Sequence, residues 1–166
     1  MYDIYSNDRN DGWRYTLGRS GKNPLLTIGL NPSTATVEKS DPTVARVDRV
    51  ASMNGYDGFI MLNLYPVRAT NYRDLPSTVN AEAFAKNLDA IEDVVKAQSK
   101  PVIWAAWGTS VKHHPFFEEA RDQLYSRLSK YKAKWLHFGD LTADGHPRHP
   151  SRLNYAWKFA PYNATT

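Results

Sequence analysis

Polar side chains follow several apolar runs of the sequence, at the points where those runs end. Asn31 comes directly after Leu25–Leu30, and Asn63 follows the apolar residues that begin at Phe59. An amide carries both a donor and an acceptor, so it suits the edge of a nucleobase, and burial demands that its polar atoms be satisfied. Asn before Pro is also an ordinary turn opener, and an Asn at a strand end can pair with neighbouring backbone. Both residues therefore have an interpretation without a ligand.

Two histidines, His146 and His149, stand three residues apart late in the chain. Pro147 between them argues against a helix, and no third ligand accompanies them, so we expect no metal site. The chain has no Cys, which excludes disulfides, thiolate metal sites and cysteine nucleophiles. No G-x-S-x-G motif supports a serine hydrolase, and the glycine motifs that bind dinucleotides or nucleotide phosphates are missing. We therefore expect no cofactor.

Arginines occur in or near the same segments and could contact phosphates. The surplus of 21 Lys and Arg over 17 Asp and Glu gives a net charge of +4, which mildly favours a polyanionic partner. Most surface arginines are merely solvated, so each of them also has an interpretation without a ligand. Aromatic residues nearby are typical of core or rim packing, although one of them could stack on a base. The arginines are Arg46, Arg49, Arg68, Arg148 and Arg152, and the aromatic residues are Tyr65, Tyr72, Trp104 and Trp107.

The elements that must position these residues alternate between strand and helix. Short continuous apolar runs are typical of strands buried on both faces, and apolar residues recurring every three or four positions indicate helices. Asp41 and Pro42 suit a helix start, and Gly55 suits its end. The predicted strands are Leu25–Leu30, Phe59–Leu64, Val102–Trp107 and Lys134–Phe138, and the predicted helices are Pro42 to about Gly55, Ala81–Ala97 and Phe117–Leu128.

Alternating strands and helices predict a three-layer α/β/α fold with a central, mainly parallel sheet of four strands in the order 2-1-3-4. Ligands of such sheets collect in the crevice beyond the carboxyl ends of the strands, where Asn31, Asn63 and the segment around His149 would meet. Trp13, Tyr15 and Leu17 alternate with other residues, which predicts an antiparallel edge strand within an N-terminal edge segment, residues 1–22.

The composition suits one globular domain over residues 1–166. The 166 residues are 42% hydrophobic, enough for a sizeable core, and neither repeats nor a linker divides them. No apolar run approaches the length that spans a bilayer, and the opening Met1-Tyr2-Asp3 lacks the features of a signal peptide. We therefore expect a cytoplasmic protein with no membrane partner.

Several motifs carry a resemblance to known families. Gly29-Leu30-Asn31-Pro32-Ser33, Leu62-Asn63-Leu64, Trp107-Gly108 and His149-Pro150-Ser151 resemble, in order, the signature series of the uracil-DNA glycosylase superfamily. More narrowly, the chain resembles the family catalogued as domain of unknown function 1643. That narrower resemblance rests on Leu30 to Ala35, Asp41-Pro42-Thr43, Asn63-Leu64 with Arg68-Ala69-Thr70, Ala105 to Gly108, and Asp144-Gly145 with Pro147 to Pro150.

The superfamily resemblance implies a uracil-DNA glycosylase-like fold and a hydrolase that acts on an extruded base in DNA. Asn31 matches the Asn form of the residue that holds the attacking water, as in the single-strand-selective and mismatch-specific types. Asn63 matches the reader of the base, and His149 matches the donor to the base oxygen. Leu153 would match the wedge that fills the vacated stack. The other implied contacts are Gly29, Pro32, Ser33 and Ser151 with the substrate, and Arg68, Arg148 and Arg152 with phosphates.

Two features depart from the superfamily pattern. Ser33 stands where a Gly is usual, and no aromatic residue lies between Asn31 and Tyr56 to stack on the base. The leading hypothesis is a glycosylase-like protein that hydrolyses an N-glycosidic bond. A nucleobase or nucleotide binder without catalysis, and an enzyme of another class acting on modified nucleotides, remain alternatives. The expected partner is nucleic acid, with single-stranded DNA included, or a nucleotide.

Overall fold

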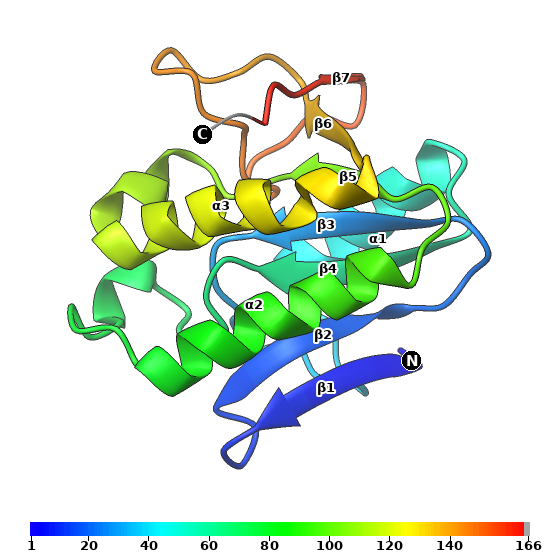
Figure 1. Ribbon diagram of the computed structural model, residues 1–166. Helices are drawn as coiled ribbons and strands as arrows, with labels where there is room; N and C mark the ends of the chain where they lie inside the picture. The colour runs from blue at the N-terminus through cyan, green and yellow to red at the C-terminus, as the bar shows by residue number, and fades with distance from the viewer. Residues whose placement is uncertain (165–166) are drawn as a thin grey trace.

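The structure, a computed structural model, describes residues 1–164, which form a mixed α/β fold around one seven-stranded sheet (Figure 1). The sheet order is β1-β2-β4-β3-β5-β6-β7. The strands are β1 (Ile4–Asp8), β2 (Trp13–Arg19), β3 (Pro24–Gly29), β4 (Gly58–Asn63), β5 (Val102–Ala105), β6 (Lys134–Phe138) and β7 (Phe159–Pro161). The helices are α1 (Pro42–Met53), α2 (Ala81–Lys96) and α3 (Pro115–Leu128), with short 3-10 turns η1 (Tyr72–Asp74), η2 (Thr109–His113) and η3 (Ser129–Tyr131).

The expected four-stranded, mainly parallel sheet is wrong, because three antiparallel strands extend it. β4, β3, β5 and β6 are adjacent in that order and pair in parallel. β1 and β2 add an antiparallel hairpin beside β4, and β7 pairs antiparallel with β6 at the opposite edge. Half of the six strand pairings are thus antiparallel.

Helices cover both faces of this sheet. In Figure 1, α2 and α3 lie in front of the sheet and α1 lies behind it. Two separate hydrophobic clusters correspond to these faces. One joins Leu88 and Ile91 of α2 to Ile28 of β3, and the other joins Val44 and Val47 of α1 to the strands. No helix within residues 1–164 has the length and apolar character needed to cross a membrane.

The local sequence explains where α1 begins. Asp41 is its N-cap, and the Asp41 Oδ1 atom accepts a hydrogen bond from the Val44 N–H at 2.9 Å. Pro42 occupies the start of the helix, where its missing N–H costs nothing. Asn54 ends the helix and Gly55 follows at a φ of 85°, a conformation that favours glycine. The start of α1 is consequently fixed at the carboxyl rim of the sheet.

The strand β2 carries a β-bulge, although the sequence suggests regular alternation. Thr16 pairs with Ser6 and Arg14 pairs with Asn7, so the intervening Tyr15 has no partner residue on β1. An extra residue changes the face to which the flanking side chains point. The bulge therefore separates side chains that a regular strand would place together.

The residues expected to form an edge strand are distributed over two faces. Leu17 packs in the cluster beneath α1, whereas Trp13 and Tyr15 pack with Ala83 of α2. β2 is antiparallel, as expected, but it is not at the edge, since β1 lies outside it. Arg14, between Trp13 and Tyr15, points to the α1 side of the sheet.

Candidate functional site

A pocket of about 760 Å³ lies at the carboxyl ends of the parallel strands. It is bounded by the loops that follow β3, β4, β5 and β6, and by the first turn of α1. Its volume is within the range of sites that bind small molecules. Eight of the residues expected at a site line it: Asn31, Pro32, Ser33, Asn63, Arg148, His149, Ser151 and Arg152.

Asn63 ends β4 and presents a buried amide to the pocket. The residue is 1% exposed, and its Nδ2 atom has no hydrogen-bond partner among the described residues. The Asn63 backbone oxygen accepts a hydrogen bond from the Asn87 Nδ2 atom at 2.7 Å. The group without a partner is therefore the side-chain Nδ2 of Asn63. Leaving such a donor unpaired costs about 1–3 kcal/mol, which makes a ligand the natural partner.

Gly29 makes room for this amide although it does not itself line the pocket. A Cβ atom at Gly29 would lie 2.9 Å from Asn63 Oδ1 and 2.7 Å from Met61 Cε. Both distances are too short for real contacts, so any side chain at Gly29 would displace its neighbours. Gly29 therefore acts by positioning Asn63.

The side-chain amide nitrogen of Asn31 is engaged in hydrogen bonds to the backbone. The Nδ2 atom donates to the backbone oxygens of Ala69, at 2.9 Å, and Pro32, at 3.2 Å. The Ala69 bond holds the loop after β3 against the loop after β4, and the Pro32 bond lies within the loop after β3. Both Asn31 donors are engaged, so the side chain offers the pocket its Oδ1 acceptor, and not the donor and acceptor that the sequence suggests.

His149 is held in one tautomer. The Ser151 N–H donates to His149 Nδ1 at 3.0 Å, so in the neutral ring the proton resides on Nε2. Burial lowers the pKa of His149 to about 4, Asp41 acts in the opposite direction, and Arg46 lowers the pKa further. Gly108 permits this placement, because a Cβ atom there would lie 2.9 Å from His149 Cβ. His149 is therefore a neutral hydrogen-bond donor near pH 7.

We expect the His149 imidazole to titrate near pH 4 in an NMR pH titration, well below the ordinary value of about 6.5. Protonation would break the Ser151 bond, since Nδ1 would no longer accept. The unfolded chain binds more protons than the folded chain between those two pH values. The free energy of unfolding should therefore rise with pH across that window. A His149 midpoint near 6.5 would contradict this placement.

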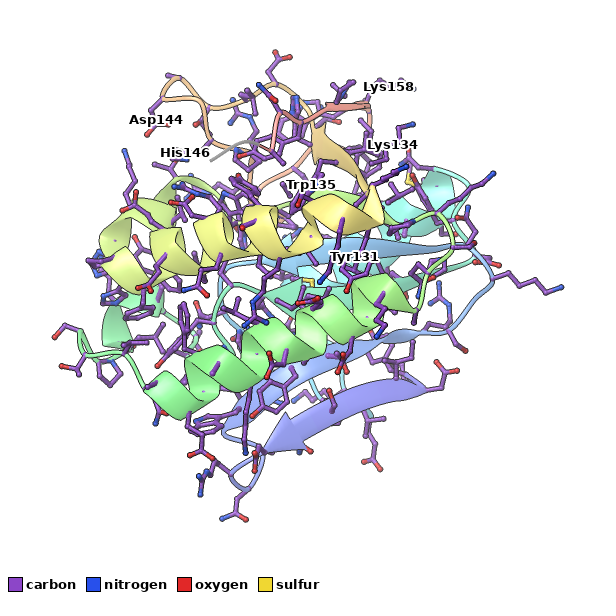
Figure 2. The ribbon with its side chains drawn as sticks, in the orientation of Figure 1. Tyr131, Lys134, Trp135, Asp144, His146 and Lys158 are labelled. Atoms are coloured by element: carbon purple, nitrogen blue, oxygen red, sulfur yellow. The ribbon has the colours of Figure 1, made fainter. Side chains whose placement is uncertain are left out.

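The loop after β6 carries His149 and is fastened at its tip. Figure 2 shows Asp144 and His146 together in this loop, and His146 Nε2 lies 3.8 Å from Asp144 Oδ2. Lys112 donates to the Asp144 carboxylate at 2.6 Å, and this bond holds the pKa of Asp144 well below its usual value. Arg148 Nε donates to the backbone oxygen of Asp140 at 2.8 Å. The pocket wall after β6 is thus anchored to η2 through Lys112 and within its own loop through Arg148.

Two expected contact residues lie elsewhere. The guanidinium of Arg68 donates to the backbone oxygens of Asp11, Ser33 and Ala35, and it also contacts Tyr5 Oη and the Asp11 carboxylate. With these donors engaged, Arg68 is a clamp within the protein and not a phosphate contact.

Leu153 also lies outside the pocket lining. It is half-buried against the hydrophobic cluster beneath α1. A wedge between stacked bases would have to be exposed, so this placement argues against the role expected from the sequence.

Two further pocket residues, Arg14 and Asp41, were not expected there on the basis of the sequence. Arg14 comes from β2, and its charge between the aromatic residues Trp13 and Tyr15 was the available signal. Asp41 is a helix cap as expected, but it also lines the pocket beside the His149 loop. Arg46 and Tyr72, which the sequence marks as a possible phosphate contact and a possible stacking ring, also line the pocket, and Tyr72 supplies an aromatic ring that the first loop lacks. Within the described chain, no three His, Cys, Asp or Glu side chains gather as metal ligands.

Comparison with known protein families places the chain in one of them. A family model described as "Protein of unknown function (DUF1643)" matches residues 14–151. This range runs from Arg14 to Ser151 and so contains nearly the whole pocket lining. No curated protein and no solved structure matches the chain.

Proposed function

The chain belongs to the DUF1643 family of proteins of unknown function, and we propose that its pocket binds a nucleobase and hydrolyses the N-glycosidic bond. The observation that carries this proposal is the unpaired, buried amide of Asn63 in the same pocket as His149 and Asn31. A nucleobase edge offers the acceptor that this amide lacks, and Tyr72 can face its ring. The motif resemblance to the uracil-DNA glycosylase superfamily supports the same function.

The chemistry follows from the available atoms. A water held by Asn31 Oδ1 attacks the anomeric carbon of the sugar, and the bond to the base breaks with its electron pair leaving on the base. The His149 Nε2–H donates a hydrogen bond to the base oxygen that gains charge. The water's proton passes through solvent to the released base. Asn31 orients the water without accepting its proton, so most of the rate gain comes from stabilising charge.

A second candidate is binding without hydrolysis, and one observation favours it. Asp41 supplies the carboxylate of the pocket lining, and both of its oxygens already accept backbone hydrogen bonds, from the Val44 N–H and the Ala35 N–H. An engaged carboxylate is a poor general base. In either case Arg148 and Arg152 are proposed to contact phosphates at the rim, and the partner is a nucleotide or nucleic acid.

The test is an assay of base release from nucleosides, nucleotides and single-stranded oligonucleotides carrying different bases, scored by chromatography. We expect one base to be released preferentially. Asn63→Ala should weaken binding of that substrate by about 10- to 100-fold and relax the choice of base, because it removes a contact to the base edge. It should leave the free energy of unfolding within about 1 kcal/mol, since the lost Asn63 donor is unpaired.

The opposite pattern would overturn the proposal. If Asn63→Ala destabilised the fold strongly and left the choice of base unchanged, Asn63 would be a structural residue. Ser110→Ala is a matched control, since Ser110 lines the pocket but has no assigned role.

A further inference from the structure

Arg14 is a buried cation without an acidic partner. The residue is 2% exposed, yet no carboxylate lies within 4.0 Å of its guanidinium in residues 1–164. One of its nitrogens donates to the Ala35 oxygen at 3.2 Å, and its Nε atom is buried with no partner. A buried charge is normally paired, so this arrangement is costly unless an anion completes it.

The guanidinium faces the pocket. The β-bulge at Tyr15 leaves Arg14 on the α1 side of the sheet, where it lines the pocket together with Asp41–Val44. The first turn of α1 supplies the Thr43 N–H, which has no acceptor among the described residues. Helix N-termini favour anions through such free N–H groups and through the helix dipole. Two independent donors thus belong to residues that line the same pocket.

The charge of the pocket lining favours an anion as well. The lining holds four arginines, Arg14, Arg46, Arg148 and Arg152, against the single carboxylate of Asp41. The nearby Arg68 is itself paired with Asp11. Burial together with Arg68 lowers the pKa of Arg14 to about 10, and Asp41 acts in the opposite direction. Arg14 stays protonated near pH 7 even so. A ligand with two negative charges would offset this surplus better than a carboxylate with one.

We propose that Arg14 and the first turn of α1 bind a phosphate monoester inside the pocket, which makes the ligand a free nucleoside monophosphate. A phosphodiester within a nucleic-acid strand is joined to a nucleotide on each side. A phosphate that contacts the buried Arg14, in contrast, must be enclosed by the pocket. A monoester has one connection and can enter with its base. The nucleobase part of this inference rests on the function proposed above, and the phosphate part rests on Arg14 alone.

The test is calorimetric binding of four probes: a panel of nucleoside 5′-monophosphates, the matching nucleosides, inorganic phosphate, and a single-stranded oligonucleotide. We expect the preferred monophosphate to bind about 10- to 100-fold more tightly than its nucleoside, and the oligonucleotide to bind no better than the nucleoside. Arg14→Met should abolish that advantage and the binding of inorganic phosphate. Arg14→Lys should retain part of both, because it keeps the charge. Arg127→Met on α3, which pairs with Asp89, is the control that should change nothing.

The outcomes separate the two proposals. If phosphate binds through Arg14 while nucleosides do not bind and Asn63→Ala has no effect, the anion site stands and the nucleobase function fails. If the monophosphate binds the wild type no more tightly than its nucleoside, or if Arg14→Met leaves the monophosphate advantage unchanged, the monophosphate proposal is overturned. If Arg14→Met does not fold, the wild-type protein still tests the proposal, because a monophosphate that binds no more tightly than its nucleoside would overturn it.

Discussion

Replacing His149 with Ala is expected to slow base release by about 10²- to 10³-fold, the usual effect of losing one preoriented donor in a transition state. The Ser151 N–H holds Nδ1, so Nε2–H is the donor available to the departing base. Charge appears on the base oxygen only as the bond breaks, so this hydrogen bond strengthens in the transition state. Binding of intact substrate should remain within about threefold of wild type. Single-turnover kinetics and equilibrium binding measure the two effects separately.

His149→Gln is the informative companion variant, since its amide keeps a donor and should recover part of the rate. A different result would favour the second candidate function. If the wild-type protein released no base from any substrate and His149→Ala weakened binding, the hydrolysis proposal would be wrong and the pocket would be a binding site alone.

Replacing Arg68 with Met should lower the free energy of unfolding by about 2 kcal/mol, because several partly buried backbone carbonyls would lose their hydrogen bonds from a charged donor. The Arg68 side chain is 17% exposed and bonds to the hairpin at Asp11 and to the loop after β3 at Ser33 and Ala35. Met preserves most of the apolar stem of Arg68 and removes every hydrogen-bond donor. The decrease in the free energy of unfolding therefore reports the contribution of the Arg68 hydrogen bonds. Urea denaturation followed by circular dichroism would report it.

Arg152→Met serves as the control for Arg68, because Arg152 is exposed at the pocket rim and should change stability by less than about 0.5 kcal/mol. Equal stability of the two variants would contradict the role of Arg68 as a clamp.

The central parallel strands and the rim of the pocket could be predicted because their signals are local. Asn31, Asn63 and His149 follow strands whose carboxyl ends must share one edge of the sheet, and they do line one pocket. The chemical roles assigned to them stay predictions. What the structure adds is the state of each group: Asn31 offers only an acceptor, His149 is neutral, and Asn63 lacks a partner.

The remaining features depend on contacts between distant segments. β7 has three residues, Phe159–Pro161, too few to show a period. Arg14 reaches the pocket because of a bulge, and no residue type within β2 marks a bulge unambiguously. Arg68 resembles any loop arginine until the fold brings Asp11 beside it across 57 positions. The roles of these residues could not be predicted from the sequence, because their surroundings are set by tertiary structure.

The position of the β1–β2 hairpin determines the shortest fragment that could keep the site. Residues 1–22 were expected to form a peripheral edge segment, but they contribute Arg14 to the pocket and Asp11 to the Arg68 clamp. β2 also pairs along β4, the strand that carries Asn63. A chain shortened to begin after residue 22 would open one wall of the pocket. It would also expose the backbone of β4 as an unpaired edge, where a strand of another molecule could add.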